Sequence, residues 1–272
     1  MKVIRGDQKE MSVLNAPDVS IVTATYNANA SIGRCLLSVA GQVGVTCEHI
    51  VIDGGSTDGT VETLREHASD LAYWCSEPDA GIADAMNKGV GHAAGEWVAF
   101  IHADDNLASP DVLAQALRKV PADADIAAFP VLFGEGRRRR LLRPRPVGPL
   151  THFKMGMCHQ GMLVRRELFC RLGGFDTSFK VCMDYEHLAR AVLAGAHVFT
   201  ADMPVLSCMS DGGISSRMDW PSLSTRFSEE KRVNEKYADT PLLQRVLSVY
   251  WWLYLPYRRL RAWIRDLGRH RR

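Results

Sequence analysis

An apolar run that ends in two adjacent carboxylates is the feature of this 272-residue chain that most restricts its fold. The residues from Trp97 to Ile101 are all apolar, as expected for a strand buried on both faces of a parallel sheet. Asp104 and Asp105 follow at the carboxyl end of this strand, the edge where open α/β sheets bind ligands. Two neighbouring carboxylates repel one another unless a cation or a shared proton offsets their charge. The pair therefore predicts a divalent-metal site, although a solvated turn before a helix near Pro110 would also explain it.

Apolar runs alternate with helix-periodic segments through the first half of the chain. The predicted strands are residues 19–25, 49–53, 71–76 and 97–101. The predicted helices are residues 31–40, 61–67, 83–90 and 112–117. Short polar or glycine-rich connections between such elements are typical of βαβ units. The predicted fold class is therefore α/β, with a Rossmann-like, mostly parallel and twisted sheet that is flanked by helices on both faces.

The alternation becomes less regular after residue 117. A further strand is predicted over residues 126–133, and the basic, proline-rich segment from Gly134 to Pro149 fits either a hairpin or a mobile loop over the site. Later elements are predicted at residues 161–164, 166–172, 183–193, 198–199 and 205–206. Residues 1–17 have no period and are expected to form a loose leader.

The composition argues against several classes of protein. Hydrophobic residues make up 46% of the chain, enough for a sizeable core. With 33 Lys and Arg against 31 Asp and Glu, a nucleic-acid binder that relies on bulk charge is not expected. The seven cysteines form no C-x-x-C pair, which is typical of reduced core thiols in a cytosolic protein. The polar N-terminus has no apolar signal-peptide region, so export is not expected either.

Four short motifs stand at or just after predicted strand ends. They are Thr25-Tyr26-Asn27, residues 53–60, residues 84–89 and residues 102–105. Further motifs follow in order at His159-Gln160-Gly161, Gly174-Phe175-Asp176, Asp184-Tyr185 and residues 212–215. This ordered series resembles the family 2 glycosyltransferases of the GT-A fold, over roughly residues 18–216.

The resemblance implies transfer of a sugar from a nucleotide-sugar, first of all a UDP-sugar, to a hydroxyl of a saccharide or lipid-linked saccharide. It also implies a divalent metal, Mn²⁺ or Mg²⁺, on the donor diphosphate and a carboxylate base for the acceptor hydroxyl. The chain then divides into the leader 1–17, a catalytic domain 18–216 and a helical, basic, aromatic extension 217–272. Within the catalytic domain, residues 18–105 would bind the nucleotide-sugar and residues 106–216 would face the acceptor.

The same resemblance implies which residues bind the nucleoside. The base and ribose pocket is expected from Thr23, Thr25, Tyr26 and Asn27. Asp53 would accept a hydrogen bond from a uracil-type base, and Gly54 and Gly55 would let the backbone approach it closely. The two glycines would suit a plain turn equally well.

The diphosphate and its metal are expected to bind further along the chain. By resemblance Asp105 is the metal ligand, while Asp104 contacts the ribose or the metal; Ala103 stands where some relatives carry another acid. A bound cation would stabilise the charge that grows on the leaving diphosphate. Asp84 and Asn87 would face the donor, with Lys88 near the diphosphate. Alternatively, Asp84 and Lys88 form only an i,i+4 ion pair.

The general base is assigned to Asp184, which precedes an apolar helical segment where burial and nearby acids raise a carboxyl pKa. The structural alternative is an acid that the helix dipole favours in the first turn. Relatives often carry Glu before this Asp, whereas this chain has Met183. On the acceptor side, His159 and Gln160 are expected to line the site, or His159 is a core histidine.

The sequence lacks the motifs that are expected for two other functions of an α/β enzyme. A nucleotidyltransferase would need a glycine-rich, basic phosphate loop after the first strand, and a dinucleotide oxidoreductase would need G-x-G-x-x-G after Val22; neither is present. A non-catalytic protein that binds nucleotide-sugars or saccharides on the same fold is the remaining alternative. The presence of both Asp105 and Asp184 argues against it.

The C-terminal extension is aromatic and then basic. Its apolar residues are Leu247, Val249, Trp251, Trp252, Leu253, Tyr254, Leu255 and Tyr257, and its first arginines after them are Arg258, Arg259, Arg261 and Arg265. The run is too short to span a bilayer, so it predicts an anchor on an anionic membrane surface and a cytoplasmic enzyme on the inner face of the cell membrane. The alternative is packing on the catalytic domain or on a second subunit. Pro256 predicts a break between a helix over residues 241–255 and a second helix.

Overall fold

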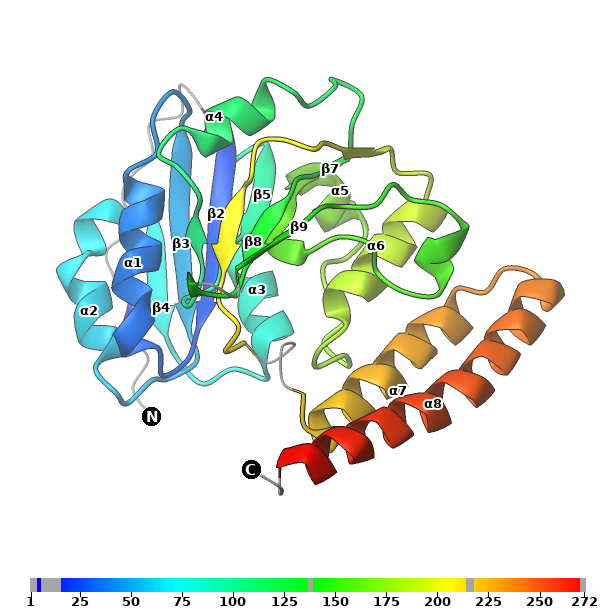
Figure 1. The fold of residues 1–272 in the computed structure, drawn as a ribbon. Coiled ribbons are helices and arrows are strands. Elements are labelled where there is room, and N and C mark those ends of the chain that lie inside the picture. Colours follow the sequence, from blue (N-terminus) through cyan, green and yellow to red (C-terminus); the bar gives the residue numbers. More distant parts are fainter. Residues whose placement is uncertain (1–3, 6–15, 137–138, 214–217, 270–272) are drawn as a thin grey trace.

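The computed structural model describes residues 4–5, 16–136, 139–213 and 218–269 (Figure 1). An eight-stranded sheet forms its centre, in the order β1-β4-β3-β2-β5-β10-β7-β11. The strands are β1 (Ile4–Arg5), β2 (Val19–Thr25), β3 (Cys47–Asp53), β4 (Tyr73–Ser76), β5 (Trp97–Phe100), β7 (Ile126–Ala128), β10 (Met162–Arg165) and β11 (Val198–Thr200). All neighbours pair in parallel except β1 and β10, which are antiparallel to the strands beside them. The predicted mostly parallel sheet is confirmed.

Helices cover both faces of this sheet. They are α1 (Asn29–Ala40), α2 (Thr60–Glu66), α3 (Ile82–Gly91), α4 (Val112–Leu117), α5 (Arg166–Arg171) and α6 (Met183–Leu193). Because side chains alternate along a strand, Val22 of β2 packs in one core with α3, α5 and α6, while its neighbour Ile21 packs in another with α1 and α4. α3 lies so close to β2 that a Cβ on Gly89 would come within 2.4 Å of Val22 Cγ1.

A second sheet of four short strands lies beside the carboxyl end of β5. Its order is β6 (Asn106–Leu107), β12 (Ser207–Met209), β8 (Val131–Phe133) and β9 (Arg140–Leu142). The single strand predicted over residues 126–133 is therefore wrong, since it divides at Phe129 and Pro130 into β7 and β8 of different sheets. Antiparallel pairing of β8 with β9 makes the described part of the basic segment a hairpin.

The N-terminal leader contributes to the sheet in its short described part. Ile4 and Arg5 form β1, which pairs antiparallel with β4, and Ile4 packs against the core around α1 and α2. The prediction of a leader without structure is therefore wrong at these two residues. The predicted boundary between residues 216 and 217 lies outside the described part of the chain.

The C-terminal extension is an antiparallel pair of helices, α7 (Trp220–Lys236) and α8 (Pro241–Arg269) (Figure 1). The predicted break at Pro256 is wrong, because α8 continues through it. A proline removes one intrahelical hydrogen bond, to the carbonyl four residues earlier. Pro256 and Trp252 both lie on the exposed side of α8, where water can bind that carbonyl.

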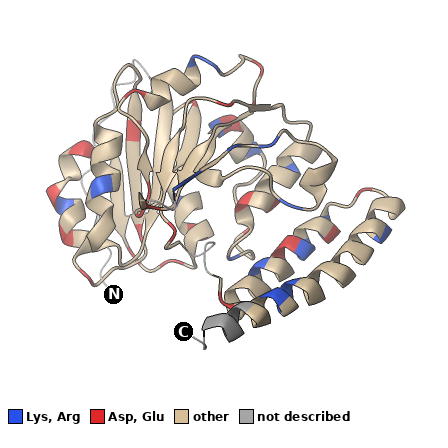
Figure 2. Cartoon of the chain, viewed as in Figure 1, with Lys and Arg blue, Asp and Glu red and all other residues tan. Residues whose placement is uncertain are grey.

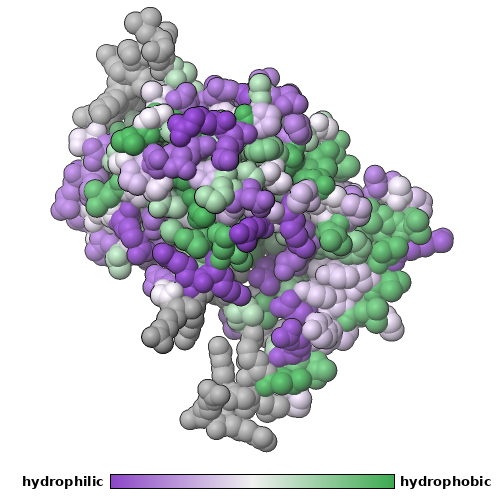
Figure 3. Space-filling view, turned by 45° about the horizontal axis from the view of Figure 1, so that its top comes forward, coloured by the Kyte–Doolittle hydropathy of each residue, from purple (hydrophilic) through white to green (hydrophobic). Residues whose placement is uncertain are grey.

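α8 has one buried face and one exposed apolar face. Leu247, Trp251 and Ala262 are buried against the rest of the molecule. The exposed apolar face, at spacings of three and four, consists of Leu242, Val246, Val249, Leu253, Tyr257, Leu260 and Ile264, with Trp252 and Trp263 beside it. Figure 3 shows apolar side chains gathered over this hairpin, and Figure 2 shows basic residues along the same helix. None of the described helices is long and apolar enough to cross a membrane.

Candidate active site

The two carboxylates after β5 have different surroundings. Asp105 is only 2% exposed, and its two oxygens accept hydrogen bonds from Gln160 Nε2 and from the Ser210 backbone N–H, each at 3.0 Å. Burial and then the charge of Asp104 raise the pKa of Asp105 to about 7. The second sheet supplies Ser210 just after β12, so this sheet holds Asp105 in place.

Asp104 instead presents its carboxylate to the site. It is partly exposed, and its side chain makes no hydrogen bond or ion pair with the described residues. Its Oδ2 faces Gly213, whose Cβ would lie 3.7 Å away. No group of three or more His, Cys, Asp or Glu side chains in the described chain could enclose a metal. Mg²⁺ and similar hard cations are commonly held by one or two carboxylates plus substrate phosphates, so the Asp104–Asp105 pair fits a metal that a diphosphate helps to bind.

The residues expected to bind the nucleoside differ in how deeply their side chains are buried at the end of β2. Thr23 is fully buried, with its hydroxyl 2.6 Å from the Ile101 carbonyl oxygen and 2.8 Å from His49 Nε2. Thr23 therefore does not line the pocket as predicted, because the core covers it. Thr25, one pleat further along, is buried with an Oγ1 that has no hydrogen-bond partner among the described residues, and Tyr26 is 65% exposed. These two residues reach the site edge.

The loop after β3 is built around Asp53. This carboxylate is fully buried and accepts hydrogen bonds from the backbone N–H groups of Gly55 (3.1 Å) and Ser56 (2.9 Å) and from the Ser76 hydroxyl (2.6 Å). Asn27, with a φ of 48°, supports the same loop by accepting a hydrogen bond from the Thr57 N–H at 2.9 Å. Asp53 and Asn27 thus stabilise the loop, and both side chains are engaged in hydrogen bonds with the protein.

Asp79 is a site residue that the sequence analysis missed. A Cβ on Gly54 would lie 2.8 Å from Asp79 Oδ2 and 3.4 Å from the Tyr26 ring. These three residues therefore meet across the ends of β2, β3 and β4. Asp79 follows the carboxyl end of β4, so the rule that singled out Asp104 and Asp105 could have found it. A side chain at position 54 would therefore displace the Asp79 carboxylate.

The polar residues of α3 mostly bind protein groups. Lys88 Nζ lies 3.1 Å from Asp84 and 3.0 Å from Glu77, so the i,i+4 ion pair is present and has a further partner that was not predicted. Asn87 pairs with the backbone of Phe175 through both ends of its amide, at 2.8 and 2.9 Å. In this structure the Asn87 amide links α3 to the segment before α6, and the contact of Asn87 with the donor stays a prediction.

The expected base lies in the first turn of α6. Asp184 is partly exposed, and its Oδ1 accepts a hydrogen bond from the Tyr185 N–H at 2.8 Å. Its surroundings raise the pKa of Asp184 to about 6, chiefly by desolvation, with smaller contributions from the carboxylates of Glu230 and Glu229 in α7. A carboxyl with this pKa is mostly ionised at neutral pH and is a stronger base than an ordinary aspartate.

The acceptor-side residues lie deeper than expected. His159 is buried in η4 (His159–Gly161), with its ring centroid 4.7 Å from that of Phe100 and 5.5 Å from that of Phe175. Burial lowers the pKa of His159 well below its usual value, so the core-histidine alternative describes it. Gln160 reaches the site only through its hydrogen bond to Asp105.

One thiol lies near both carboxylate centres. Burial and then the charges of Asp184 and Asp105 raise the pKa of Cys158 to about 11. Both acids thus act electrostatically on one side chain, although they lie 79 positions apart in the sequence. The candidate site therefore contains one buried and one partly exposed carboxylate after β5, together with the Asp184 carboxylate in the first turn of α6.

Comparisons with known proteins identify the family to which the chain is similar. A family model described as "Glycosyl transferase family 2" matches residues 20–173. An uncharacterized glycosyltransferase of Mycobacterium tuberculosis is 37% identical over 187 residues, covering 66% of this chain and 70% of that protein.

Two solved structures share the fold. Mannosyltransferase PcManGT from Pyrobaculum calidifontis, in complex with GDP-Man and Mn²⁺, has a TM-score of 0.66 at 21% identity, covering 92% of this chain and 74% of that chain. S. aureus TarS 1-349 in complex with UDP-GlcNAc has a TM-score of 0.65 at 18% identity, covering 85% and 69%. The chain spans 41% of a longer TarS chain.

Proposed function

This chain belongs to glycosyl transferase family 2 and is a glycosyltransferase of the GT-A fold, and we propose that Asp184 is the general base of its transfer reaction. In this proposal a sugar passes from a nucleotide-sugar to a hydroxyl of a saccharide or lipid-linked saccharide. The observation that supports it is that Asp184 and Asp105 both lie close enough to Cys158 to raise the pKa of its thiol. One centre then binds the leaving diphosphate while the other takes the acceptor proton.

The donor is proposed to bind across the carboxyl ends of β2, β3 and β4, against Thr25, Tyr26, Gly54 and Asp79. Thr25 supports this assignment because its buried hydroxyl has no hydrogen-bond partner in the described structure. A UDP-sugar is the first donor to test and a GDP-sugar the second, since the two solved neighbours hold UDP-GlcNAc and GDP-Man. Asp53 would then act through the shape of the Gly54–Ser56 loop.

The diphosphate end of the donor is proposed to lie beside the Asp104–Asp105 pair. A divalent cation bound there would stabilise the negative charge of the leaving nucleoside diphosphate. Asp104 is the ligand that needs no rearrangement, because its carboxylate has no protein partner in the described structure. Asp105 would adjoin the cation while its contacts with Gln160 and Ser210 fix the turn. Lys88 stays with Glu77 and Asp84 at the edge of this region.

The acceptor is proposed to approach through a hollow of about 430 Å³ between α3, the segment 177–181 and α7. Apolar lining comes from Ile82, Phe179 and Val181, and polar lining from Thr177, Lys180 and Ser222. A saccharide that carries an apolar group suits such a mixed surface. The hollow adjoins the segment that leads into Asp184, which would take the proton of the attacking hydroxyl.

The exposed face of α8 is proposed to rest on an anionic membrane surface, so that the enzyme is cytoplasmic and peripheral on the inner face. Its apolar side chains are too numerous and too regularly spaced to be isolated surface residues. Arg245, Arg259 and Arg261 are exposed near this face, which suits anionic headgroups. The lipid-linked alternative for the acceptor gains support from such a location.

Release of nucleoside diphosphate tests the proposed function. The purified chain is incubated with Mn²⁺ or Mg²⁺ and a panel of UDP- and GDP-sugars, together with saccharide and lipid-linked acceptors. Turnover with at least one donor is expected, and it should require the cation. Tight nucleotide binding without any turnover across the panel would instead favour a binding protein.

A further inference from the structure

The C-terminal hairpin holds the backbone directly before the proposed base. The Glu229 carboxylate of α7 accepts three backbone hydrogen bonds, from the N–H groups of Lys180 (2.8 Å), Val181 (2.8 Å) and Cys182 (2.9 Å). Glu229 is itself buried. Hydrogen bonds to an ionised carboxylate are about twice as strong as those between neutral groups. This segment is therefore fixed by a residue that lies almost fifty positions later in the chain.

One of these contacts reaches the start of α6. Cys182 is the N-cap residue of α6, and its own side chain makes no cap hydrogen bond. Backbone N–H groups at a helix start need acceptors, and a negative charge is favoured there by the helix dipole. Glu229, from a neighbouring helix, supplies an acceptor and a negative charge at the Cys182 N–H, and it also binds the two N–H groups of the preceding loop. The position of the first turn, which carries Asp184, thus depends on where α7 lies.

A second contact holds the residue on the other side of Asp184. The Tyr185 hydroxyl accepts a hydrogen bond from Asn234 Nδ2 at 2.8 Å and donates to the Thr151 carbonyl at 2.6 Å. Asn234 Oδ1 accepts in turn from the indole N–H of Trp251 in α8, at 2.8 Å. Tyr185, Asn234 and Trp251 are all buried.

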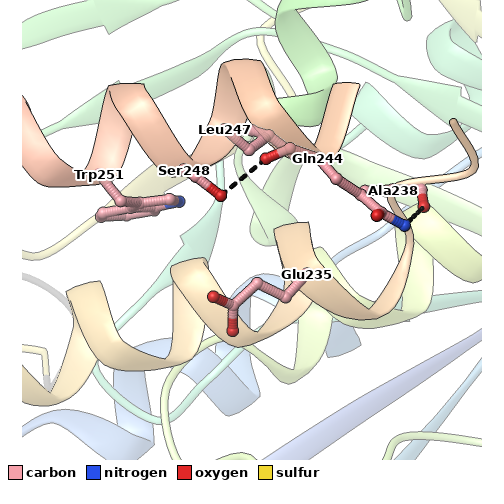
Figure 4. Close-up of a pocket in the computed structure, with 6 residues that line it drawn as sticks. All are labelled: Glu235, Ala238, Gln244, Leu247, Ser248 and Trp251. Atoms are coloured by element: carbon pink, nitrogen blue, oxygen red, sulfur yellow. Dashed lines mark hydrogen bonds between the residues drawn. The ribbon is translucent and has the colours of Figure 1, made fainter. Parts of the chain in front are cut away.

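Trp251 connects this network to the interior of the hairpin. It lines a hollow of about 210 Å³ between α7 and α8, together with Glu235, Ala238, Gln244, Leu247 and Ser248 (Figure 4). The indole also packs against aromatic neighbours, with its ring centroid 5.1 Å from that of Tyr250 and 5.7 Å from that of Tyr254. Both helices of the hairpin therefore take part in holding Tyr185.

We propose that the α7–α8 hairpin is a positioning device for the general base, with Glu229 and Asn234 as its positioning residues. The inference rests on the proposed role of Asp184. Glu229 fixes the chain on one side of Asp184 and Asn234 fixes it on the other, so the carboxylate keeps one place relative to the acceptor hydroxyl. The helix pair that carries the exposed apolar face thereby also positions the proposed base through these two residues.

The test compares Glu229→Gln with Glu235→Gln in the full chain. Glu235 lies on the same helix but is exposed and pairs only with Lys231 among the described residues, so its variant controls for lost charge on α7. The probe is nucleoside diphosphate release from the donor that turns over fastest, at saturating Mn²⁺. In Glu229→Gln kcat should fall about tenfold or more, because small misplacements of a reacting group are costly, while the donor KM stays within about twofold. Hydrogen exchange of residues 180–185 should accelerate in this variant alone.

Asn234→Leu is a second test of the positioning role. Leucine has a similar side-chain volume but cannot form the hydrogen bonds with Tyr185 and Trp251. This variant should also lower kcat without raising the donor KM, and it carries the test if Glu229→Gln does not fold. Wild-type kcat in both variants, with Asp184→Asn inactive, would overturn the positioning role alone. Wild-type kcat in Asp184→Asn would overturn the base itself, and the positioning role with it.

Discussion

Asp104 and Asp105 are adjacent in sequence, yet their carboxylates do different work. Asp105 is buried and satisfies two donors from distant segments, whereas Asp104 is open and unpaired within the described structure. A buried, paired carboxylate mainly holds its surroundings together. An open one can bind a cation with little reorganisation of the protein.

Alanine substitutions should separate these two roles. Asp105→Ala leaves the Gln160 amide and the Ser210 N–H without acceptors, so the free energy of unfolding should drop by about 1–3 kcal/mol. Asp104→Ala should change it by less than about 0.5 kcal/mol, yet abolish the gain in UDP affinity that Mn²⁺ provides. Urea denaturation and calorimetric titration measure the two effects. Equal loss of stability in both variants would contradict the assignment.

The candidate site residues could be named from the sequence, but how deeply each side chain is buried could not. Thr23 and Thr25 share one strand face and are both buried, but the Thr23 hydroxyl contacts Cys35 of α1 and the Ile101 carbonyl, whereas the Thr25 hydroxyl has no hydrogen-bond partner among the described residues. Asn87 occurs in a motif that predicts donor contact, but its partner is Phe175, 88 positions away. Such long-range partners leave no periodic pattern in the sequence.

At the scale of single elements, α3 shows how close packing restricts composition. Gly89 faces Val22 of β2 at a distance that leaves no room for a methyl group, whereas a Cβ added to Gly91 would have no neighbouring atom within 4 Å in the described structure. The two glycines stand two residues apart in one helix. The same substitution can therefore be compared at a crowded and at an open position of one helix.

Gly89→Ala and Gly91→Ala should therefore change stability in opposite directions. The first should lower the free energy of unfolding by about 1–3 kcal/mol through overpacking. The second should raise it by up to about 1 kcal/mol, because alanine favours the helix. Denaturant unfolding of both variants measures this difference. A similar effect of the two substitutions would show that α3 does not pack on β2 as described.

The aromatic run in α8 did not reveal from the sequence which of its side chains are buried and which are exposed. Trp251 and Trp252 are neighbours in one aromatic run, yet Trp251 is 2% exposed and Trp252 is 76% exposed. The run carries aromatic residues on both helical faces, so the sequence supported both a surface anchor and packing on the catalytic domain. In the structure, one face of α8 is buried within the molecule and the opposite face is exposed.

At the scale of the whole molecule, the exposed face of α8 should bind anionic vesicles. Leu253→Glu introduces a charge into this face and should weaken co-sedimentation with phosphatidylglycerol vesicles about tenfold, since it removes apolar burial. Ser248→Glu carries the same charge change outside the exposed apolar face and should bind like the wild type. Phosphatidylcholine vesicles should bind the wild type more weakly.

Two outcomes would contradict the membrane role. Equal sedimentation of Leu253→Glu and the wild type would exclude the exposed face as the contact. A concentration-dependent dimer that Leu253→Glu dissociates, without vesicle binding by the wild type, would assign the same face to a second copy of the chain.

The overall architecture was largely predictable, because alternating apolar runs and helices specify a parallel sheet. The antiparallel β10, the division of residues 126–133 and the participation of Ile4 were not, since each depends on which strands become neighbours. The C-terminal hairpin was predicted as helical but not as a support for α6. Its key residue, Glu229, lies in a helix whose polar pattern gives no sign of a buried carboxylate.

The pH dependence of sugar transfer tests the central claim most directly. Asp184 must be ionised to accept a proton, and its surroundings raise the pKa of Asp184 to about 6. The donor kcat/KM at saturating Mn²⁺, which keeps the Asp104–Asp105 pair ionised, should therefore rise about tenfold per pH unit below pH 6 and level off above it. Asp184→Asn should be at least about 10²-fold slower and lack this rise. A wild-type rate in Asp184→Asn, or the same acid limb in both proteins, would contradict the account.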